Sequence, residues 1–397
     1  MKRRIPRVYT NGNYKVMITP NGTKRRKTYD DELIPSFAEN CDVKITDKCN
    51  QRCPFCYEKC NPTGKHADLK KYKTLINSLH PHTEMSLNGN DMDHPDLEWF
   101  LKELLVKEVI ANVTVNQNQF IQNIDKLREL TKNGLIKGVG ISLKSINQDF
   151  LNLLKEFPNA VIHTIAGILD EDTIMSMKDK GLKVLILGYK NIGFGRGYLG
   201  SNEDKIKNNM NTLSKLLPDI INEKWFDILS FDNLALTQLP IVKETVSEKE
   251  WEEEYMGDDG GFTFYIDLVK GQFSKNSVSQ VRKDCNDLTV DEMFKAVKDI
   301  CKSKADKFII EGEDEVFNYG KFTVIDENGI EQSVSVPPTD RVSESKNTKV
   351  NPMLFESEKD AEVYLQTFLS ELKADKDITY FIKEYGNSVT YKINNNE

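Results

Sequence analysis

The chain has 397 residues, of which 39% are hydrophobic and 29% are charged, and its net charge is −8. This length allows a barrel-sized core with one or two additions, and the acidic balance argues against a general nucleic-acid binder. The longest apolar runs, such as 184–187, are far too short to span a membrane, and no apolar stretch follows the basic residues 1–7, so we expect neither a membrane span nor a signal peptide.

The first predicted element is a β-hairpin within residues 11–28. This segment carries two Asn-Gly pairs, and the second of them, Asn21-Gly22, is placed to form the turn. We interpret residues 1–35 as an N-terminal β-hairpin appendage. The basic run 24–27 is typical of a solvated strand end, and contact with an acidic substrate is the less favoured interpretation.

From residue 42 onward, expected strands alternate with expected helices. Helical stretches include 67–79 and 170–178, and strands are expected at 42–46, 83–87, 109–115, 137–143, 160–165, 183–187 and 226–231. Alternation of this kind predicts parallel strands with right-handed crossovers, and therefore an α/β fold. Folds of this class place their chemistry at the carboxyl ends of the strands.

Three cysteines follow the first of these strands on one short loop. Cys49, Cys53 and Cys56 form a C-x3-C-x2-C run with an aromatic residue just before the last cysteine. Iron–sulfur clusters are held by cysteine thiolates, usually four. Three thiolates would hold three irons of a four-iron cluster and leave the fourth iron for a ligand that is not protein. Cysteines used in this way indicate a reducing compartment, and we expect a cytoplasmic protein.

The same loop allows a different metal. Cys60 and His66 lie close enough in the sequence to complete a zinc site, so a zinc-stabilised binding protein is the alternative interpretation. Cys60 could also saturate a cluster as a fourth ligand, although a spare thiol is the favoured interpretation. The later Cys285 and Cys301 are too few for a second cluster domain, so we expect one cluster.

After residue 240 the alternation ends. We expect a hairpin at 260–273, a helix at 289–304, strands within 307–336 with a turn at Asn328-Gly329, a helix from Ser357 to Leu372 and a last hairpin at Gly386-Asn387. We interpret residues 241–304 as a C-terminal extension covering the mouth of the preceding domain. Residues 305–397 are expected to form a small α+β accessory domain.

The cysteine loop carries a resemblance to a known family. Residues 42–68, DVKITDKCNQRCPFCYEKCNPTGKHAD, resemble the cluster loop of the radical S-adenosylmethionine (SAM) superfamily. The resemblance implies a partial (β/α)6 barrel, which we place at 36–240. It also implies one 4Fe-4S cluster on Cys49, Cys53 and Cys56, and reductive cleavage of SAM to a 5′-deoxyadenosyl radical that abstracts hydrogen from a substrate.

The resemblance leaves the partners general. The substrate is unidentified, and both a peptide or protein and a nucleotide-type small molecule are open. An electron donor such as flavodoxin or ferredoxin is the second implied partner. No membrane partner is expected, and nucleic acid is disfavoured by the net charge of −8.

The resemblance also implies a binding site for SAM. The turn that receives the SAM amino group reads Asn88, Gly89, Asn90 here, with an amide where an acid is usual. Ser142 and Lys144 end the fourth strand and would bind the ribose and the SAM carboxylate. The other candidates are a loop aromatic, a second ribose ligand and two backbone positions beside the adenine, namely Phe55, Asn116, Leu187 and Gly188.

Plainer interpretations compete with some of these assignments. Residues 88–90 could be an ordinary turn, and Lys144 a solvated lysine at a helix entry. His163 is expected to be a packed histidine rather than a catalyst. The glycine-rich run 191–197 lacks the strand–turn–helix context of a phosphate cradle, so we expect a flexible lip of the active site there.

Overall fold

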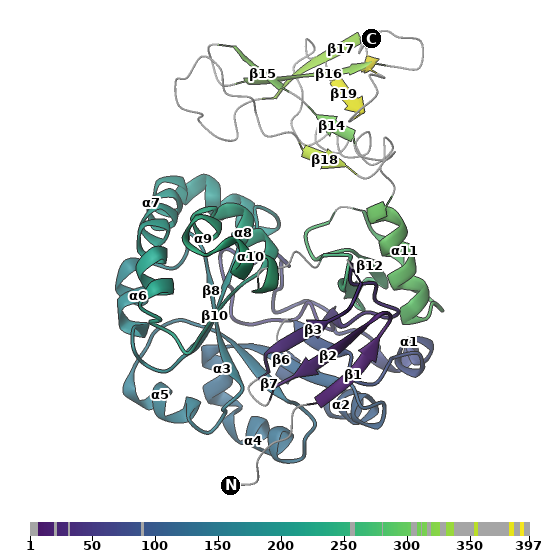
Figure 1. The fold of residues 1–397 in the computed structure, drawn as a ribbon, viewed down its shortest axis with the longest axis vertical. Helices are drawn as coiled ribbons and strands as arrows, with labels where there is room; N and C mark the ends of the chain where they lie inside the picture. Colours follow the sequence, from purple (N-terminus) through teal and green to yellow (C-terminus); the bar gives the residue numbers. More distant parts are fainter. Residues whose placement is uncertain are drawn as a thin grey trace. The chain divides into compact units, whose positions relative to one another are not determined.

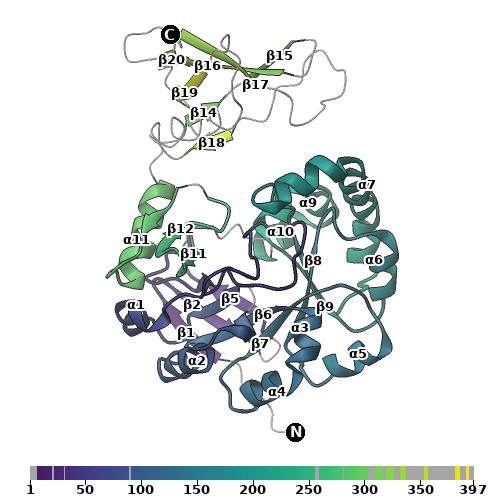
Figure 2. The same ribbon diagram turned by 180° about the vertical axis from the view of Figure 1, so that it is seen from behind.

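The computed structural model describes residues 7–19, 22–30, 32–88, 91–254, 259–279 and 281–302, and seven short strands between residues 308 and 392. The chain divides into two units, Met1–Lys295 and Ala296–Glu397. The candidate site lies in the first unit, which is drawn from two sides in Figures 1 and 2. None of its described helices, and none of those in the second unit, is long and apolar enough to cross a membrane.

A small antiparallel sheet opens the first unit. Its strands are β1 (Arg7–Asn11), β2 (Tyr14–Ile18) and β3 (Lys24–Lys27). The predicted hairpin is the β2–β3 pair, in which Ile18 lies opposite Lys24. β1 was not predicted; it pairs with β2 across a turn at Gly12, whose φ of 59° suits a residue without a Cβ.

The main sheet has ten strands in the order β10-β9-β8-β7-β6-β5-β4-β11-β12-β13. The strands are β4 (Asn40–Lys44), β5 (Glu84–Asn88), β6 (Ile110–Asn116), β7 (Gly138–Ser142), β8 (Ala160–Ile165), β9 (Lys183–Leu187), β10 (Ile228–Phe231), β11 (Thr263–Asp267), β12 (Gln272–Ser274) and β13 (Lys283–Asp284). Every pairing from β10 to β11 is parallel, whereas β12 and β13 are antiparallel additions. All seven predicted parallel strands are present, and the α/β class is confirmed.

The last parallel strand comes from the extension. The hairpin expected at 260–273 is present as β11 and β12. β11 also pairs in parallel with β4, so that Asp267 lies opposite Lys44. The strand that carries the cysteine loop therefore has a parallel neighbour on each side, β5 and β11.

Helices surround the parallel strands in Figures 1 and 2. They are α1 (Lys73–Asn77), α2 (Leu97–Val106), α3 (Gln117–Gln122), α4 (Ile124–Lys132), α5 (Gln148–Leu154), α6 (Glu171–Met177), α7 (Phe194–Asn222), α8 (Asn233–Gln238), α9 (Ile241–Thr245), α10 (Glu248–Glu254) and α11 (Val290–Lys302), with short 3-10 turns at Leu69–Lys71 and Asp91–Asp93. The predicted helices at 67–79, 170–178 and 289–304 correspond to α1, α6 and α11. Asp170 caps α6 by accepting a hydrogen bond from the Thr173 N–H.

The sheet separates an apolar face from a polar one. Along β6, Val113 and Val115 are fully buried, while the alternate residues Asn112, Thr114 and Asn116 are only half-buried. Because successive side chains of a strand point to opposite faces, the valines build the core and the polar residues line a pocket. The alternation seen in the sequence therefore sets both the fold and the polar surface.

The second unit is described only by strands. β14 (Phe308–Ile310), β18 (Met353–Phe355), β19 (Phe381–Glu384) and β20 (Thr390–Lys392) form one sheet, and β15 (Gly312–Glu315), β16 (Tyr319–Ile325) and β17 (Glu331–Val336) form another. The antiparallel pairs β16–β17 and β19–β20 flank the predicted turns at 328–329 and 386–387. Those turns and the helix expected at 357–372 lie outside the described residues.

Candidate active site

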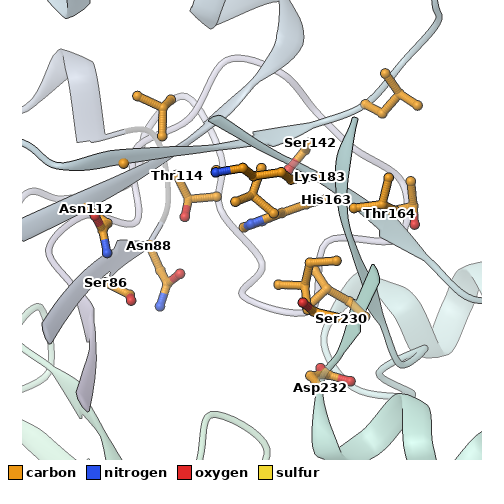
Figure 3. A pocket seen from close by; sticks show the side chains of 18 of the residues that line it. Ser86, Asn88, Asn112, Thr114, Ser142, His163, Thr164, Lys183, Ser230 and Asp232 are labelled. Carbon is orange, nitrogen blue, oxygen red and sulfur yellow. The ribbon is translucent and has the colours of Figure 1, made fainter. Parts of the chain in front are cut away.

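A pocket of about 2290 Å³ lies on the polar face of the parallel strands. Strands β4 to β10, the cysteine loop and the N-terminal sheet all contribute lining residues. Figure 3 shows polar side chains from several strands around it, among them Ser86, Asn88, Asn112, Thr114, Ser142, His163, Lys183, Ser230 and Asp232. Apolar side chains such as Val139 and Leu185 line it as well, so the pocket offers both kinds of surface.

The cysteine loop follows β4 at the rim of the pocket. Its two ends are joined by backbone hydrogen bonds, from the Cys49 N–H to the Asn61 carbonyl at 2.9 Å and from the Asp47 N–H to the Lys65 carbonyl at 2.8 Å. Gly64 lets the two ends approach, because a Cβ there would lie 2.2 Å from the Asp47 carbonyl oxygen. Cys49, Cys53 and Cys56 are half-buried on this loop and all line the pocket.

The three thiols are close enough to affect one another. Burial raises the pKa of Cys49 and of Cys53, and a charge on Cys56 raises both further. In the part of the chain that the structure describes, no three His, Cys, Asp or Glu side chains gather as ligands of one metal ion. A cluster requires a different arrangement, because each thiolate binds its own iron and the ligands surround the cluster instead of meeting at a point. The donor set fits that requirement.

Cys60 differs from the other thiols of the loop. It is buried, and its Sγ lies 3.9 Å from the Thr46 carbonyl oxygen. The interaction with Cys60 lowers the pKa of Cys56, whereas the interaction with Cys56 and burial raise the pKa of Cys60. Cys60 is thus a buried thiol that keeps its proton and donates it in a hydrogen bond to the Thr46 carbonyl.

A buried lysine lies beneath the loop. Lys44 ends β4 with a relative exposure of 1%, and its Nζ lies 2.5 Å from Asp47 and 2.6 Å from Glu58. Asp267 of β11 approaches the same Nζ at 3.8 Å. Burial alone would lower the pKa of Lys44, but the attraction of Glu58 and the other carboxylates raises it above the usual value. This cluster was not predicted, although the sequence contains a lysine five residues before Cys49 and a glutamate two residues after Cys56.

The glycine-rich run corrects one expectation. Residues 191–197 do have a strand–turn–helix context, since β9 precedes them and α7 begins at Phe194. Their glycines serve the cysteine loop: a Cβ on Gly193, whose φ is 63°, would lie 2.1 Å from the Tyr57 carbonyl oxygen. The Phe194 N–H donates to the Cys56 carbonyl at 3.0 Å. The start of α7 is therefore a packing surface for the loop.

The candidate SAM ligands are spread along the same rim. Six of them line the pocket: Phe55, Asn88, Asn116, Ser142, Lys144 and Leu187. Asn116 also caps α3 by accepting from the Asn118 N–H. The Leu187 carbonyl accepts from the Ala166 N–H, and the Gly188 N–H donates to Asp232 at 2.8 Å, so these two backbone groups already have partners. Gly89 and Asn90 lie outside the described residues.

Two titratable side chains inside the pocket were not predicted as site residues. His163 lies flat against β7, where a Cβ on Gly140 would come within 2.4 Å of its ring. Burial lowers the pKa of His163 to about 4, so the imidazole is neutral at physiological pH. Asp42 of β4 is exposed to the pocket as well, and Asn40 donates to it at 3.1 Å. Only the position of each residue on the pocket face could have indicated this.

Comparison with known proteins identifies the domain. Residues 43–189 match the family model described as the radical SAM superfamily. This part of the chain belongs to the radical SAM superfamily. The match begins within β4 and ends after β9, so it includes the cysteine loop and most of the strands that line the pocket, while β10 and β11 follow it.

Curated relatives of the radical SAM domain are GTP 3′,8-cyclases. The protein from Clostridium perfringens is 28% identical over 211 residues, which cover 45% of this chain and 63% of the relative. The protein from Clostridium botulinum is 22% identical over 251 residues, covering 61% of this chain and 68% of the relative. The chain thus spans less than two thirds of the length of the first of them.

Among solved structures, Streptococcus suis SuiB bound to S-adenosylmethionine is similar to this chain. It is 13% identical, with a TM-score of 0.45, over 67% of this chain and 69% of SuiB. Radical SAM proteins use a 4Fe-4S cluster and SAM. The three cysteines and the polar rim of this radical SAM domain are the groups available for them.

Proposed function

We propose that the chain is a radical SAM enzyme in which Cys49, Cys53 and Cys56 bind one 4Fe-4S cluster. The observation that carries this proposal is the C-x3-C-x2-C loop, whose three thiols all face one polar pocket within the matched domain. Held by these cysteines, a reduced cluster would supply the electron for cleavage of SAM to a 5′-deoxyadenosyl radical, which would take a hydrogen atom from the substrate. The chain must therefore hold SAM and substrate together in this pocket and exclude water from them.

We interpret β4 to β9 as the partial (β/α)6 barrel. Support comes from their order in the sheet, which follows the chain, and from the parallel pairing of every neighbour. In this interpretation the pocket is the inside of the barrel. Neighbouring strands β10 and β11 extend its wall on either side.

The rim side chains would bind SAM by charge and hydrogen bonding. Lys144 lines the pocket near Cys53, where its positive charge opposes the rise that burial causes in the pKa of that thiol. An ammonium group there suits the SAM carboxylate. Asn88 ends β5 and Ser142 ends β7, and both side chains face the same space (Figure 3). Their neutral groups suit the amino group and the ribose.

The pocket favours an anionic small molecule as the substrate. Ten lysine and arginine residues line it against seven aspartate and glutamate residues, although the whole chain has a net charge of −8. A cleft that concentrates one sign of charge attracts ligands of the opposite sign. This supports the nucleotide-type substrate over a peptide, and the names of the curated relatives make GTP the first probe.

The test of the proposed function starts with anaerobic purification. We expect a brown protein with about four irons per chain, and SAM cleavage to 5′-deoxyadenosine under dithionite. Cys53→Ala should lose both, whereas Cys285→Ala, which changes a buried thiol away from the loop, should keep both. A colourless protein with stoichiometric zinc would refute the proposal in favour of the zinc-stabilised binding protein.

The substrate class has its own test. GTP, a dipeptide and a buffer blank are each added to the reduced enzyme with SAM, and 5′-deoxyadenosine is measured together with loss of the added compound. A gain in cleavage with GTP, coupled to its conversion, supports a nucleotide-type substrate. A gain with the peptide alone contradicts it. Replacing dithionite with reduced flavodoxin or ferredoxin tests the proposed electron donor in the same assay.

A further inference from the structure

We propose that Lys44, Glu58 and Tyr265 position the third cysteine of the loop, by fixing the turn that follows Cys56. The inference rests on the proposed function, because it concerns a cluster bound by that cysteine. It assigns a task to a strand of the extension, since Tyr265 belongs to β11. These three are positioning residues, as none of them is a ligand in the proposed site.

Lys44 joins the two sides of the cysteine loop. Asp47 precedes Cys49, and Glu58 follows Cys56, yet both carboxylates reach the same buried ammonium group at 2.5 and 2.6 Å. The side chain of Lys44 is only 2% exposed, so water does not screen these attractions. The beginning and the end of the C-x3-C-x2-C segment are therefore held at a fixed separation.

Both oxygens of the Glu58 carboxylate are occupied. Oε2 accepts from Lys44 Nζ at 2.6 Å, and Oε1 accepts from the Tyr265 hydroxyl at 3.0 Å. Arg282 lies over the face of the Tyr265 ring at 4.9 Å and helps to hold the ring in place. A carboxylate gripped by two donors leaves its residue little freedom, so the backbone at Glu58 is also fixed.

The backbone around Glu58 forms a turn with the cysteine. Glu58 lies inside this turn, in which the Lys59 N–H donates to the Cys56 carbonyl at 3.3 Å. The net charge around an iron–sulfur cluster helps to set its reduction potential, and groups that orient a ligand affect its metal affinity. A route of contacts thus runs from Lys44 and Tyr265 through Glu58 to the backbone of Cys56.

The most conservative substitutions that test the inference are Glu58→Gln and Tyr265→Phe, because each keeps the shape of its side chain. Glu98→Gln is the matched control: it removes an exposed ion pair with Lys102 on α2, far from the loop in sequence. Each variant is purified anaerobically as the full chain with its cluster. Iron loss to a chelator, the midpoint potential of the cluster and the melting temperature of the cluster-free protein are measured.

We expect Glu58→Gln and Tyr265→Phe to lose iron about 10- to 100-fold faster than the wild type. We also expect their midpoint potentials to shift, with Glu58→Gln more positive because a negative charge near the cluster is removed. Glu98→Gln should match the wild type in both. The inference would be overturned if Glu58→Gln and Tyr265→Phe both lost iron at the wild-type rate and kept the wild-type potential. It would also be overturned if iron loss rose only in proportion to a lower melting temperature while the potential stayed unchanged. Failure of the wild type itself to bind iron would instead refute the proposed function.

Discussion

Cys56 and Cys60 form a pair with unequal protonation. Their interaction raises the pKa of the Cys60 thiol and lowers the pKa of Cys56, so Cys60 is the one that keeps its proton. A fourth cysteine in the loop therefore need not close the cluster to SAM. Its contacts with Cys56 and the Thr46 carbonyl give it a structural reason to be buried there.

Replacement of Cys60 separates these two roles. We expect Cys60→Ala to keep iron and SAM cleavage, because three thiolates remain on the loop, whereas Cys56→Ala loses both. Iron per chain and 5′-deoxyadenosine after reduction are the measurements. A Cys60→Ala protein without iron would mean that the fourth thiolate is a ligand and that the open iron is absent.

His163 should stay neutral well below physiological pH. Its pKa is about 4 in the fold against an ordinary value of 6.5, so protonation favours the unfolded chain. The contribution of His163 to stability is therefore complete above pH 6.5 and is lost as the pH falls from about 6.5 to 4. Full linkage would be about 3 kcal/mol, and contact of the ring with water in the pocket reduces it to about 1–3 kcal/mol.

The measurement compares the wild type with His163→Gln. Urea unfolding at pH 7 and pH 5 should show a smaller loss of unfolding free energy for the variant, since other titrating groups are common to both proteins. NMR titration of the His163 ring gives the pKa directly. A ring that titrates near pH 6.5 would contradict the burial described for the pocket.

Among the elements, α7 supports the cysteine loop through its first glycines. Gly193→Ala places a Cβ against the Tyr57 carbonyl and imposes a left-handed φ of 63° on alanine. We expect a loss of about 1–2 kcal/mol in unfolding free energy and a lower iron content. Gly197→Ala is the control, because its Cβ would meet nothing within 4 Å and alanine favours the helix. Equal behaviour of the two variants would show that the close approach is unimportant.

The seven predicted strands were accessible from sequence for a physical reason. Segments such as Val113–Val115 in β6 carry apolar residues that must be buried and polar residues between them, and this period-2 pattern is local. The cysteine loop was equally local, because its chemistry depends on spacing within eight residues. Seven strands and three thiols thus followed from short stretches of chain.

Other features depend on partners distant in the sequence. The start of α7 at Phe194 was missed because glycines at 193, 195 and 197 argue against a helix, and only the close approach of Tyr57 explains Gly193. The hairpin of β11 and β12 was predicted. The pairing of β11 with β4 was not, because neither segment carries a local pattern that indicates its partner strand. Lys44 was missed for the same reason. A lysine on a strand is expected to be exposed, and only the folded structure shows the three carboxylates that surround it.

For the molecule as a whole, the candidate site is contained in one unit. All residues that line the pocket lie within Met1–Lys295, as do Lys44 and its partners. The proposed boundaries at 35, 240 and 304 remain predictions. The role of residues 305–397 likewise remains a prediction.

Removal of the second part of the chain tests this division. We expect a protein ending at Lys302, which keeps α11 intact, to bind iron and to cleave SAM at rates within a few-fold of the full chain. Iron per chain and 5′-deoxyadenosine formation under dithionite are the measurements. Loss of both activities in a protein that remains folded by circular dichroism would place part of the site in residues 303–397.

The parallel pairing of β4 with β11 also has a consequence for biosynthesis. Tyr265 and Glu58 are separated by 207 positions in the chain, so a ribosome completes the cysteines long before it makes the strand that secures them. Contacts of such long range form late and slow the folding of a domain. The nascent thiols of the loop therefore spend about half of translation without their final support. We expect stable metal insertion only after residue 265 has been made.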